Sequence, residues 1–292
     1  MKKEKKINCI ICSGNAYKHY YPDIFFNNKH FNYYQCVNCK TIQIHPLPSE
    51  EDFNMMYGLA DHTYLSKTEK ITYTQISNKK NHQNLQLYFF DKYKYYKNAK
   101  TLLDYGCGSG FYIHHAKKYN LECTGVEFNK EFSRIVAQKS GYNIVSIDDI
   151  GEQTFDLIHV GHVLEHLTNP YEIIEQLKKF AHKNTLFIFD GPLENNACLS
   201  RYIIKLGSKI KQKKQNSIDP QHITLTNYNS QLLFFNNCML NKINYEVCEV
   251  NFPLPDKIDL KKPHTIPLYL LSELSVQLSK LHPKFDYAGR IK

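Results

Sequence analysis

Apolar residues follow two different periods along the chain, and the change of period falls near residue 100. From about residue 49 to residue 98 they recur at helical spacing, as Leu85, Phe89 and Tyr93 do. Beyond residue 100, short apolar runs alternate with helical stretches of about 10–15 residues. Such alternation is typical of a parallel β-sheet with helices on both faces.

The alternating part predicts a definite order of elements. Strands are predicted at 101–105, 123–127, 144–147, 155–160, 185–190 and 245–250, and helices at 111–119, 130–140, 170–181 and 227–240. A last apolar helix is predicted at 268–281, and no convincing strand can be placed after it. Near the N-terminus, short β-like runs at 31–35 and 41–44 end at two prolines, Pro46 and Pro48.

These changes of pattern divide the chain into three parts. Residues 1–48 form a small N-terminal unit, 49–98 a helical connector that can cover a bound ligand, and 99–292 the main α/β domain. Within the main domain, residues 193–218 interrupt the alternation as an insertion. A chain of 292 residues with 42% hydrophobic residues can bury a core, which excludes the disordered class.

The sequence gives no sign of membrane insertion or secretion. No run approaches the roughly 18 consecutive apolar residues of a membrane-spanning helix. The basic N-terminus, Met1–Cys12, lacks the apolar segment and the small-residue cleavage site of a secretory signal. We therefore expect a cytoplasmic protein.

The formal net charge of +9 raises nucleic acid as a partner, but its distribution argues otherwise. Arginine, which reads base edges and phosphates bidentately, occurs only three times in the chain. Residues 2–6, with four lysines and one glutamate, carry +3, and residues 195–218, with one arginine and five lysines, carry +6. The rest of the chain is formally neutral, so the charge belongs to the N-terminal tail and the insertion.

Four of the nine cysteines form two Cys-x-x-Cys pairs, Cys9 with Cys12 and Cys36 with Cys39. The odd total of nine cysteines and the absence of a secretory signal argue against a disulfide framework. Two such pairs can place four thiolates at the corners of a tetrahedron, the geometry that Zn²⁺ takes in structural sites. We predict a structural zinc ion, with free or redox-active pairs as the alternative.

The stretch Leu102–Gly110 ends a strand, passes through three glycines and begins a helix. Glycines allow a sharp turn and let backbone N–H groups approach a ligand closely. The spacing is Gly-x-Gly-x-Gly, one residue shorter than the dinucleotide fingerprint, and Asp104 precedes the first glycine by two residues. A carboxylate directed at this turn suits a ligand with an ammonium group and disfavours a pyrophosphate.

At this point the chain resembles the class I S-adenosylmethionine-dependent methyltransferases, whose first motif, Asp-x-Gly-x-Gly-x-Gly, matches Asp104–Gly110. Glu127 ends the second strand, where this family holds both ribose hydroxyls with a carboxylate. Asp148 or Asp149 follows the third strand, near the adenine. The fourth strand and its sequel, with Leu164-Glu165-His166, resemble the family's Phe-Asp…Leu-Glu-His pattern.

The resemblance implies a Rossmann-like, doubly wound, mostly parallel sheet for residues 99–292, preceded by a small zinc ribbon and a helical segment that acts as a lid over the cofactor. It implies S-adenosylmethionine as that cofactor. The residues that it assigns to the cofactor are Asp104, Gly106, Cys107, Gly108, Gly110, Glu127, Phe128, Asp148 and His162. The zinc ligands would be Cys9, Cys12, Cys36 and Cys39.

Paired cysteines followed by Pro46-Leu47-Pro48 and a helical stretch also resemble the N-terminal part of bacterial sugar methyltransferases. In those enzymes a Glu-His pair precedes a Ser/Thr and a helix, and the matching position here is Gln221-His222. We predict His222 as the catalytic base or a substrate ligand, although glutamine in place of glutamate disfavours carbon methylation. His166 is expected to be structural. Tyr57 and Tyr64 are candidates to cap the adenine, but packing in the core is the favoured role of both.

This resemblance implies a small-molecule acceptor, a sugar or a nucleotide- or lipid-linked sugar. The basic insertion is then a lid that attracts the acceptor's phosphate, with a membrane-surface helix or a solvated charge run as alternatives. Two other functions compete. A zinc-ribbon RNA methyltransferase is disfavoured by the scarcity of arginine, and a non-catalytic binding module is disfavoured by the intact glycine motif.

Overall fold

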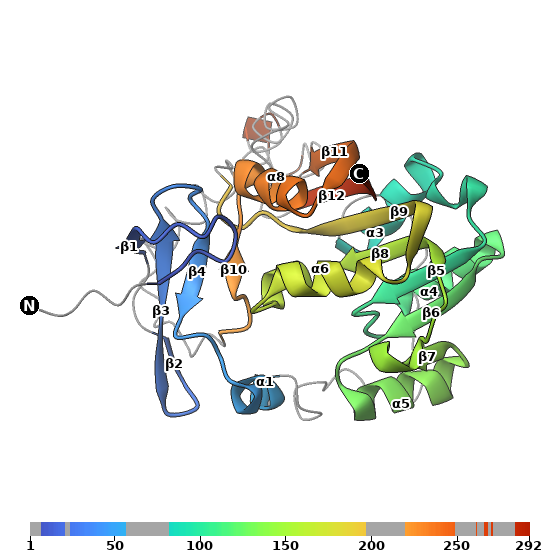
Figure 1. Ribbon diagram of the computed structural model, residues 1–292, viewed down its shortest axis with the longest axis horizontal. Helices are drawn as coiled ribbons and strands as arrows, with labels where there is room; N and C mark the ends of the chain where they lie inside the picture. The colour runs from blue at the N-terminus through green and yellow to red at the C-terminus, as the bar shows by residue number, and fades with distance from the viewer. Residues whose placement is uncertain are drawn as a thin grey trace, which may run out of the picture.

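The computed structural model describes residues 7–20, 24–56, 82–196, 220–248, 261, 266–267, 270 and 284–292. These residues form a large α/β body and a small antiparallel sheet beside it (Figure 1). Among the described residues, no helix is long and apolar enough to cross a membrane. Parts of three predicted segments lie outside the described residues: positions 57–81 of the connector, positions 197–218 of the insertion, and all of the helix 268–281 except residue 270. Tyr57 and Tyr64 are among these positions.

The large sheet has seven strands in the order β11-β12-β9-β8-β5-β6-β7. The five strands from β9 to β7 are parallel, whereas β12 is antiparallel to both β9 and β11. The strands are β5 (Thr101–Tyr105), β6 (Glu122–Val126), β7 (Asn143–Val145), β8 (Phe155–Gly161), β9 (Ala181–Pro192), β11 (Leu240–Cys248) and β12 (Lys284–Ile291). Chain order reverses between β5 and β8, the position where ligands bind in open α/β sheets.

Helices cover both faces of this sheet, as the alternation predicted. The helices are α3 (His82–Lys92), α4 (Phe111–Ala116), α5 (Lys130–Ser140), α6 (Pro170–Lys178) and α8 (Tyr228–Asn237). Successive side chains of a strand point to opposite faces, so Leu102 packs with the α3 and α4 residues and Leu103 packs with those of α6 and α8. Short 3-10 turns connect several elements: η1 (Tyr95–Asn98), η2 (Lys117–Tyr119), η3 (Ile147–Asp149) and η4 (Leu164–His166).

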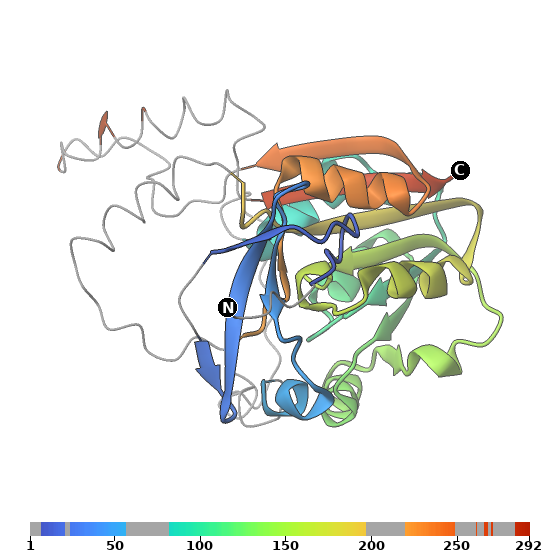
Figure 2. The same ribbon diagram turned by 60° about the vertical axis from the view of Figure 1, so that its left-hand side comes forward.

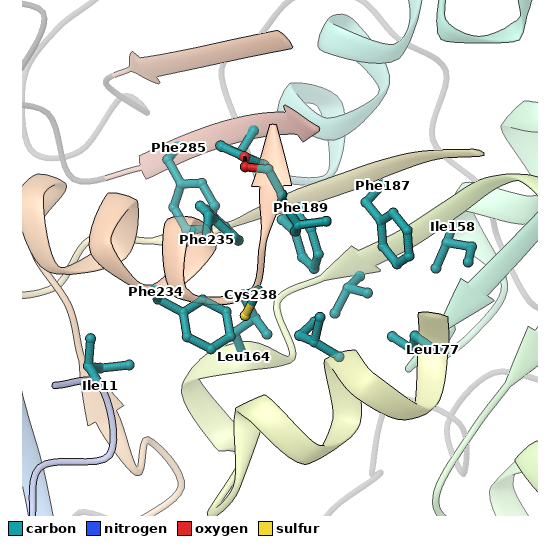
Figure 3. Packing of buried hydrophobic residues seen from close by; sticks show 14 of the residues in the cluster. Ile11, Ile158, Leu164, Leu177, Phe187, Phe189, Phe234, Phe235, Cys238 and Phe285 are labelled. Atoms are coloured by element: carbon teal, nitrogen blue, oxygen red, sulfur yellow. Dashed lines mark hydrogen bonds between the residues drawn. The ribbon is translucent and has the colours of Figure 1, made fainter. Parts of the chain in front are cut away.

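The core on the α6 and α8 face is aromatic (Figure 3). Phe187 and Phe189 of β9 stack with centroids 6.2 Å apart, and Phe235 of α8 lies over Tyr287 of β12 at 3.9 Å. All four side chains are fully buried. Ile11, from the N-terminal unit, belongs to the same cluster, so this core joins the two parts of the molecule.

The small sheet consists of β1 (Tyr17–His19), β2 (Ile24–Phe26), β3 (Lys29–Cys36), β4 (Ile42–His45) and β10 (Thr224–Leu225). Helix α1 (Glu50–Met56) follows β4 in the chain. β10 is far from the other four strands in the sequence, and it pairs antiparallel with β4. Figures 1 and 2 show the small sheet standing against the body, with β10 between β4 and α6. The N-terminal unit is therefore attached to the body by main-chain pairing as well as by packing.

The predictions of the elements were mostly confirmed, with one clear error. Strand β12, for which the sequence gave no prediction, lies in the sheet between β9 and β11. Its run Lys284–Ile291 includes Asp286, Gly289 and Arg290, which break the apolar pattern of a buried strand. The predicted helix 170–181 is also shorter, because α6 ends at Lys178 and β9 begins at Ala181.

Candidate functional site

The glycine turn between β5 and α4 has the backbone geometry that the sequence predicted. Gly106, Gly108 and Gly110 all have positive φ, at 74°, 52° and 76°. A Cβ atom on Gly106 would lie 2.4 Å from Val163 Cγ2, so that position also excludes a side chain by contact. A Cβ atom on Gly108 would have no neighbour within 4 Å, so the turn faces open space there. A ligand can approach the backbone at Gly108.

Glu127 lies directly beside this turn, just beyond the end of β6. Its Oε2 accepts a hydrogen bond from Gly108 N at 3.0 Å, and its Oε1 accepts one from Asn129 N at 3.1 Å. The carboxylate is therefore fixed in orientation, and its two oxygens together offer about four acceptor positions. The next side chain, Phe128, is 70% exposed and offers an aromatic face at the same edge of the sheet.

The other residues that the sequence assigned to the cofactor have different surroundings. Cys107 is buried, and its sulfur would lie 2.8 Å from a Cβ atom on Gly125, so its side chain packs into the core. Burial raises the pKa of its thiol well above the usual value. Asp148 is exposed on η3, after β7. His162 follows β8 with a φ of 54° and donates its backbone N–H to Asp190 O at 2.9 Å.

Asp104, at the end of β5, belongs to a buried network that the sequence did not predict. Its side chain is 2% exposed, and Oδ1 lies 2.7 Å from His159 Nδ1. The other nitrogen of His159, Nε2, lies 2.7 Å from Asp190 Oδ2, and the ring stacks on Tyr112 with centroids 3.5 Å apart. Asp104 Oδ2 is buried without a hydrogen-bond partner among the described residues. The structure thus adds His159 and Asp190, which sequence reasoning missed.

The two carboxylates control the charge of His159. Burial by itself lowers the pKa of the imidazole, but the attraction and hydrogen bonds of Asp104 and Asp190 outweigh it and raise the pKa to about 9. His159 therefore carries a positive charge at neutral pH. Gln86 of α3 donates to the second oxygen of Asp190 at 2.6 Å, so the helix before the sheet is tied to this network.

A second cluster of ionisable side chains lies where β8 and β9 end and β10 begins. Glu165 and His166 belong to η4, Glu194 follows β9, and His222 precedes β10. His222 Nδ1 lies 2.5 Å from Glu194 Oε2, and His166 Nδ1 lies 2.9 Å from the carbonyl oxygen of Gln221. The two imidazole rings meet edge to face with centroids 4.7 Å apart. The predicted base His222 and the supposedly structural His166 therefore belong to one site.

The charges in this cluster interact strongly. Burial acts to raise the pKa of Glu165, but the neighbouring histidines, His162 and His166, bring it down to about 2. Burial lowers the pKa of His166 below its usual value. Burial acts in the same direction on His222, but the hydrogen bond to Glu194 raises its pKa above the usual value. Sequence reasoning did not find Glu194, because it is 28 positions from His222 and belongs to no motif.

The four N-terminal cysteines come together as the spacing predicted. Cys9 Sγ lies 3.5 Å from Cys39 Sγ, and Cys12 Sγ lies 3.6 Å from Cys36 Sγ. All four cysteines are free thiols. Sulfur atoms at the corners of a tetrahedron with Zn–S bonds of about 2.3 Å are about 3.8 Å apart, so the donor set and its spacing fit a zinc ion. Hydrogen bonds with Cys9 and Thr41 lower the pKa of Cys39 to about 5, which favours its thiolate.

Both cysteine pairs sit on turns of the same geometry. After the first pair, Ser13 has a φ of 57° and donates its N–H to Cys9 O at 2.8 Å. After the second, Lys40 has a φ of 64° and donates its N–H to Cys36 O at 3.1 Å. This repeated turn directs the two sulfurs of each pair to the same side.

The N-terminal unit (residues 1–48) is hydrogen-bonded to segments at and beside the second cluster. Tyr33 of β3 donates its hydroxyl to His222 O at 2.8 Å, and Ile44 N of β4 donates to Ile223 O at 3.0 Å. Asn227, the N-cap of α8, donates to Cys39 O at 3.3 Å. The loop that carries His222 is thus held from the N-terminal side.

Comparison with known proteins identifies the family of this arrangement. A family model described as a methyltransferase domain matches residues 77–233, more than half of the chain. The chain belongs to this methyltransferase domain family. The match includes the glycine turn, Glu127, the His159 network, Glu165, His166 and His222, but not the four cysteines.

Individual relatives of this chain are distant. The ajmaline N-methyltransferase of Rauvolfia serpentina is 26% identical over 149 residues, 47% of this chain and 51% of that protein, so the match spans about half of this curated relative. A SAM-dependent methyltransferase from Archaeoglobus fulgidus has a similar structure, with a TM-score of 0.50 at 16% identity over 72% of this chain and 95% of the other. The structure of a plantazolicin methyltransferase in complex with SAH matches with a TM-score of 0.44 at 16% identity, over 72% of this chain and 82% of the other. Its sheet order and these matches give the chain the Rossmann-like α/β fold of class I methyltransferases.

Proposed function

We propose that the protein uses S-adenosylmethionine to methylate a small-molecule acceptor. The observation that carries this proposal is the position of Glu127, whose carboxylate is fixed against the glycine turn by Gly108 N and Asn129 N. A carboxylate held in this way can accept both hydroxyls of a ribose. When bound, the cofactor supplies an electrophilic methyl group on a sulfonium.

The other cofactor contacts that we propose follow from the same edge of the sheet. The open space at Gly108 admits a ligand close to the backbone, and Phe128 offers a ring for stacking on the adenine. Asp148, after β7, lies at the end of the neighbouring strand. Asp104 Oδ2 is an acceptor without a partner among the described residues, which suits the ammonium group of the cofactor's methionine part. Together with His162, these residues make the cofactor site.

We propose His222 as the residue that acts on the acceptor. Glu194 holds its Nδ1, so Nε2 is the nitrogen that can take the acceptor's proton. The acceptor that we propose is a sugar or a nucleotide- or lipid-linked sugar. Two features support this acceptor class, because both resemble the sugar methyltransferases. One is the set of four N-terminal cysteines, which we propose to bind a structural zinc ion, and the other is the Gln221-His222 segment.

The test of the cofactor site is calorimetric binding of S-adenosylhomocysteine to the wild type and to Glu127→Ala and Glu127→Gln. Two charge-assisted hydrogen bonds are each worth about 1.5–3 kcal/mol, so Glu127→Ala is expected to weaken binding by at least about 100-fold. Glu127→Gln keeps the size and one acceptor oxygen, and an intermediate loss is expected.

Glu122→Ala is the matched control, because Glu122 is an exposed glutamate at the other end of the same strand. It should bind S-adenosylhomocysteine like the wild type. Wild-type affinity in Glu127→Ala would refute the assignment of Glu127. The acceptor class is then sought by incubating the wild type with labelled S-adenosylmethionine and a panel of nucleotide sugars, polysaccharide fragments and short RNAs, read by mass spectrometry.

A further inference from the structure

We propose that Glu165, His166 and His222 bind a divalent transition-metal ion on the acceptor side of the site. One ligand atom from each of the three side chains lies within 4.8 Å of the other two. Two imidazoles and one carboxylate form a donor set that binds Zn²⁺, Fe²⁺ and similar ions and leaves coordination positions open. The inference rests on the proposed methyl transfer and extends it to the way the acceptor is held.

The hydrogen bonds of the two histidines select the nitrogen that an ion would use. A carbonyl oxygen only accepts, so His166 Nδ1 donates its proton to Gln221 O. His222 Nδ1 likewise faces an acceptor, Glu194 Oε2. In each neutral ring the lone pair is then on Nε2. Metal-binding histidines almost always have their other nitrogen bound to a carboxylate or backbone carbonyl in this way, which fixes the tautomer and the ring orientation.

The third ligand is placed to complete the set. The Glu165 side chain is 7% exposed, and its Oε1 lies 3.9 Å from His166 Nε2. Two ligands of a tetrahedral ion with bonds of about 2.0–2.2 Å are about 3.3–3.6 Å apart, so this pair needs to close by only a few tenths of an ångström. His222 is on a different segment, and its ligand nitrogen lies within 4.8 Å of the other two ligand atoms, so it closes on the ion by about 1 Å. Its segment is secured by Ile223 N, which donates to Glu165 O at 2.6 Å.

The location of the cluster gives the ion a function. Val163, two residues before Glu165, packs against Gly106 of the glycine turn, so the cluster adjoins the proposed cofactor site. His166 and His222 are only half-buried, which leaves the open coordination positions accessible. An ion here would bind an oxygen or nitrogen atom of the acceptor and lower the pKa of its proton. With the ion bound, His222 Nε2 is a ligand, and the proton leaves to solvent.

The test is a Co²⁺ titration of the full-length protein whose cysteine cluster is loaded with zinc, followed by visible absorption and by metal analysis. We expect one Co²⁺ per chain in addition to one zinc, with a spectrum that lacks thiolate-to-cobalt charge transfer. His166→Ala and His222→Ala should each weaken Co²⁺ binding by more than about 100-fold. Glu194→Gln, which alters only the support of His222, should weaken it by about 10–100-fold.

His19→Ala is the control, because His19 lies on β1 of the small sheet and pairs with Asn32. It should bind Co²⁺ like the wild type. His222→Gln, which keeps the side-chain size, replaces His222→Ala if the latter fails to retain one zinc per chain. Absence of Co²⁺ beyond the cysteine site, or unchanged binding in the histidine variants, would overturn the inference.

S-adenosylhomocysteine binding, measured on the same samples, separates this inference from the proposed function. Cofactor binding without Co²⁺ binding rejects the metal site and leaves His222 as the base. Co²⁺ binding without cofactor binding rejects the proposed methyl transfer and retains the metal site.

Discussion

Gly106 has two separate reasons to be glycine. Its φ of 74° is in the left-handed region, and a Cβ atom there would lie 2.4 Å from Val163 Cγ2. Gly141, at the end of α5, has nearly the same φ, 71°, but a Cβ atom on it would meet no atom within 4 Å. The chain therefore contains a matched pair that separates backbone strain from steric contact.

We predict that Gly106→Ala destabilises the protein more than Gly141→Ala does. Gly141→Ala should cost about 1 kcal/mol of unfolding free energy, because only the left-handed backbone is strained. Gly106→Ala should cost about 2–4 kcal/mol, since Val163 must also move. Urea unfolding followed by circular dichroism measures both, and equal costs would show that the contact with Val163 is unimportant. Adding Val163→Ala should recover part of the loss only in the Gly106 variant.

At the scale of elements, three neighbouring strands each contribute one ionisable side chain to a buried network. Asp104 comes from β5, His159 from β8 and Asp190 from β9, and all are at most 5% exposed. A buried charge is tolerated only when it is paired and hydrogen-bonded. The imidazolium, lying between the two carboxylates, offsets the repulsion that they would otherwise exert on each other in the middle of the sheet.

The pH dependence of stability should reveal this network. The pKa of His159 is raised from 6.5 to about 9 in the folded protein, so its stabilising contribution is complete below about pH 6.5 and is lost as pH rises through about 9. His159→Gln should cost about 3–5 kcal/mol near neutral pH, because two buried carboxylates lose their cation. That difference from the wild type should shrink between about pH 7 and pH 10 in urea unfolding.

His182→Gln provides the control for this measurement. His182 Nε2 lies 3.1 Å from Asp156 Oδ1, but both side chains are partly exposed. Such a pair is worth about 0–1 kcal/mol, so the control should differ little from the wild type across the same range. A His159→Gln difference that stays constant with pH would mean that His159 is not the titrating group.

The elements themselves show where a local pattern is sufficient and where it fails. β5 and α5 have the predicted bounds, because each has a clean period and definite end signals, such as Gly141 after α5. β12 was missed because its polar residue Asp286 is buried against partners from distant segments. Tyr95 donates to Asp286 Oδ1 at 2.8 Å, and Asn244 donates to it at 3.3 Å. A local pattern cannot show such partners.

At the scale of the whole molecule, the N-terminal unit and the methyltransferase domain are joined by strand pairing and by a side-chain hydrogen bond. β10 pairs with β4, and Tyr33 donates to the backbone of His222. The unit that we propose to bind zinc is therefore one support of the loop that carries the proposed catalytic residue. Loss of the zinc ion should therefore loosen the acceptor site before it loosens the central sheet.

We predict that removing zinc with a chelator loosens the His222 loop selectively. Hydrogen exchange at Ile44 N, which donates to Ile223 O, should accelerate by about tenfold or more. The amides of β5, in the centre of the large sheet, should exchange as before. Cys36→Ser should reproduce the effect and lose the zinc, whereas Cys238→Ser, at a buried cysteine outside the cluster, should retain one zinc per chain. Unchanged exchange at Ile44 would show that the loop does not depend on the metal.

Features that depend on near neighbours in the chain follow from the amino-acid sequence alone. These are the alternation of strands and helices, the glycine turn with Glu127 one strand later, and the two cysteine pairs with their turns, because spacing and local backbone geometry define them. Which distant side chains pair with one another becomes visible only in the folded protein. His159 between Asp104 and Asp190, Glu194 on His222, and β12 within the sheet all join segments far apart in sequence, and burial gives those contacts their strength.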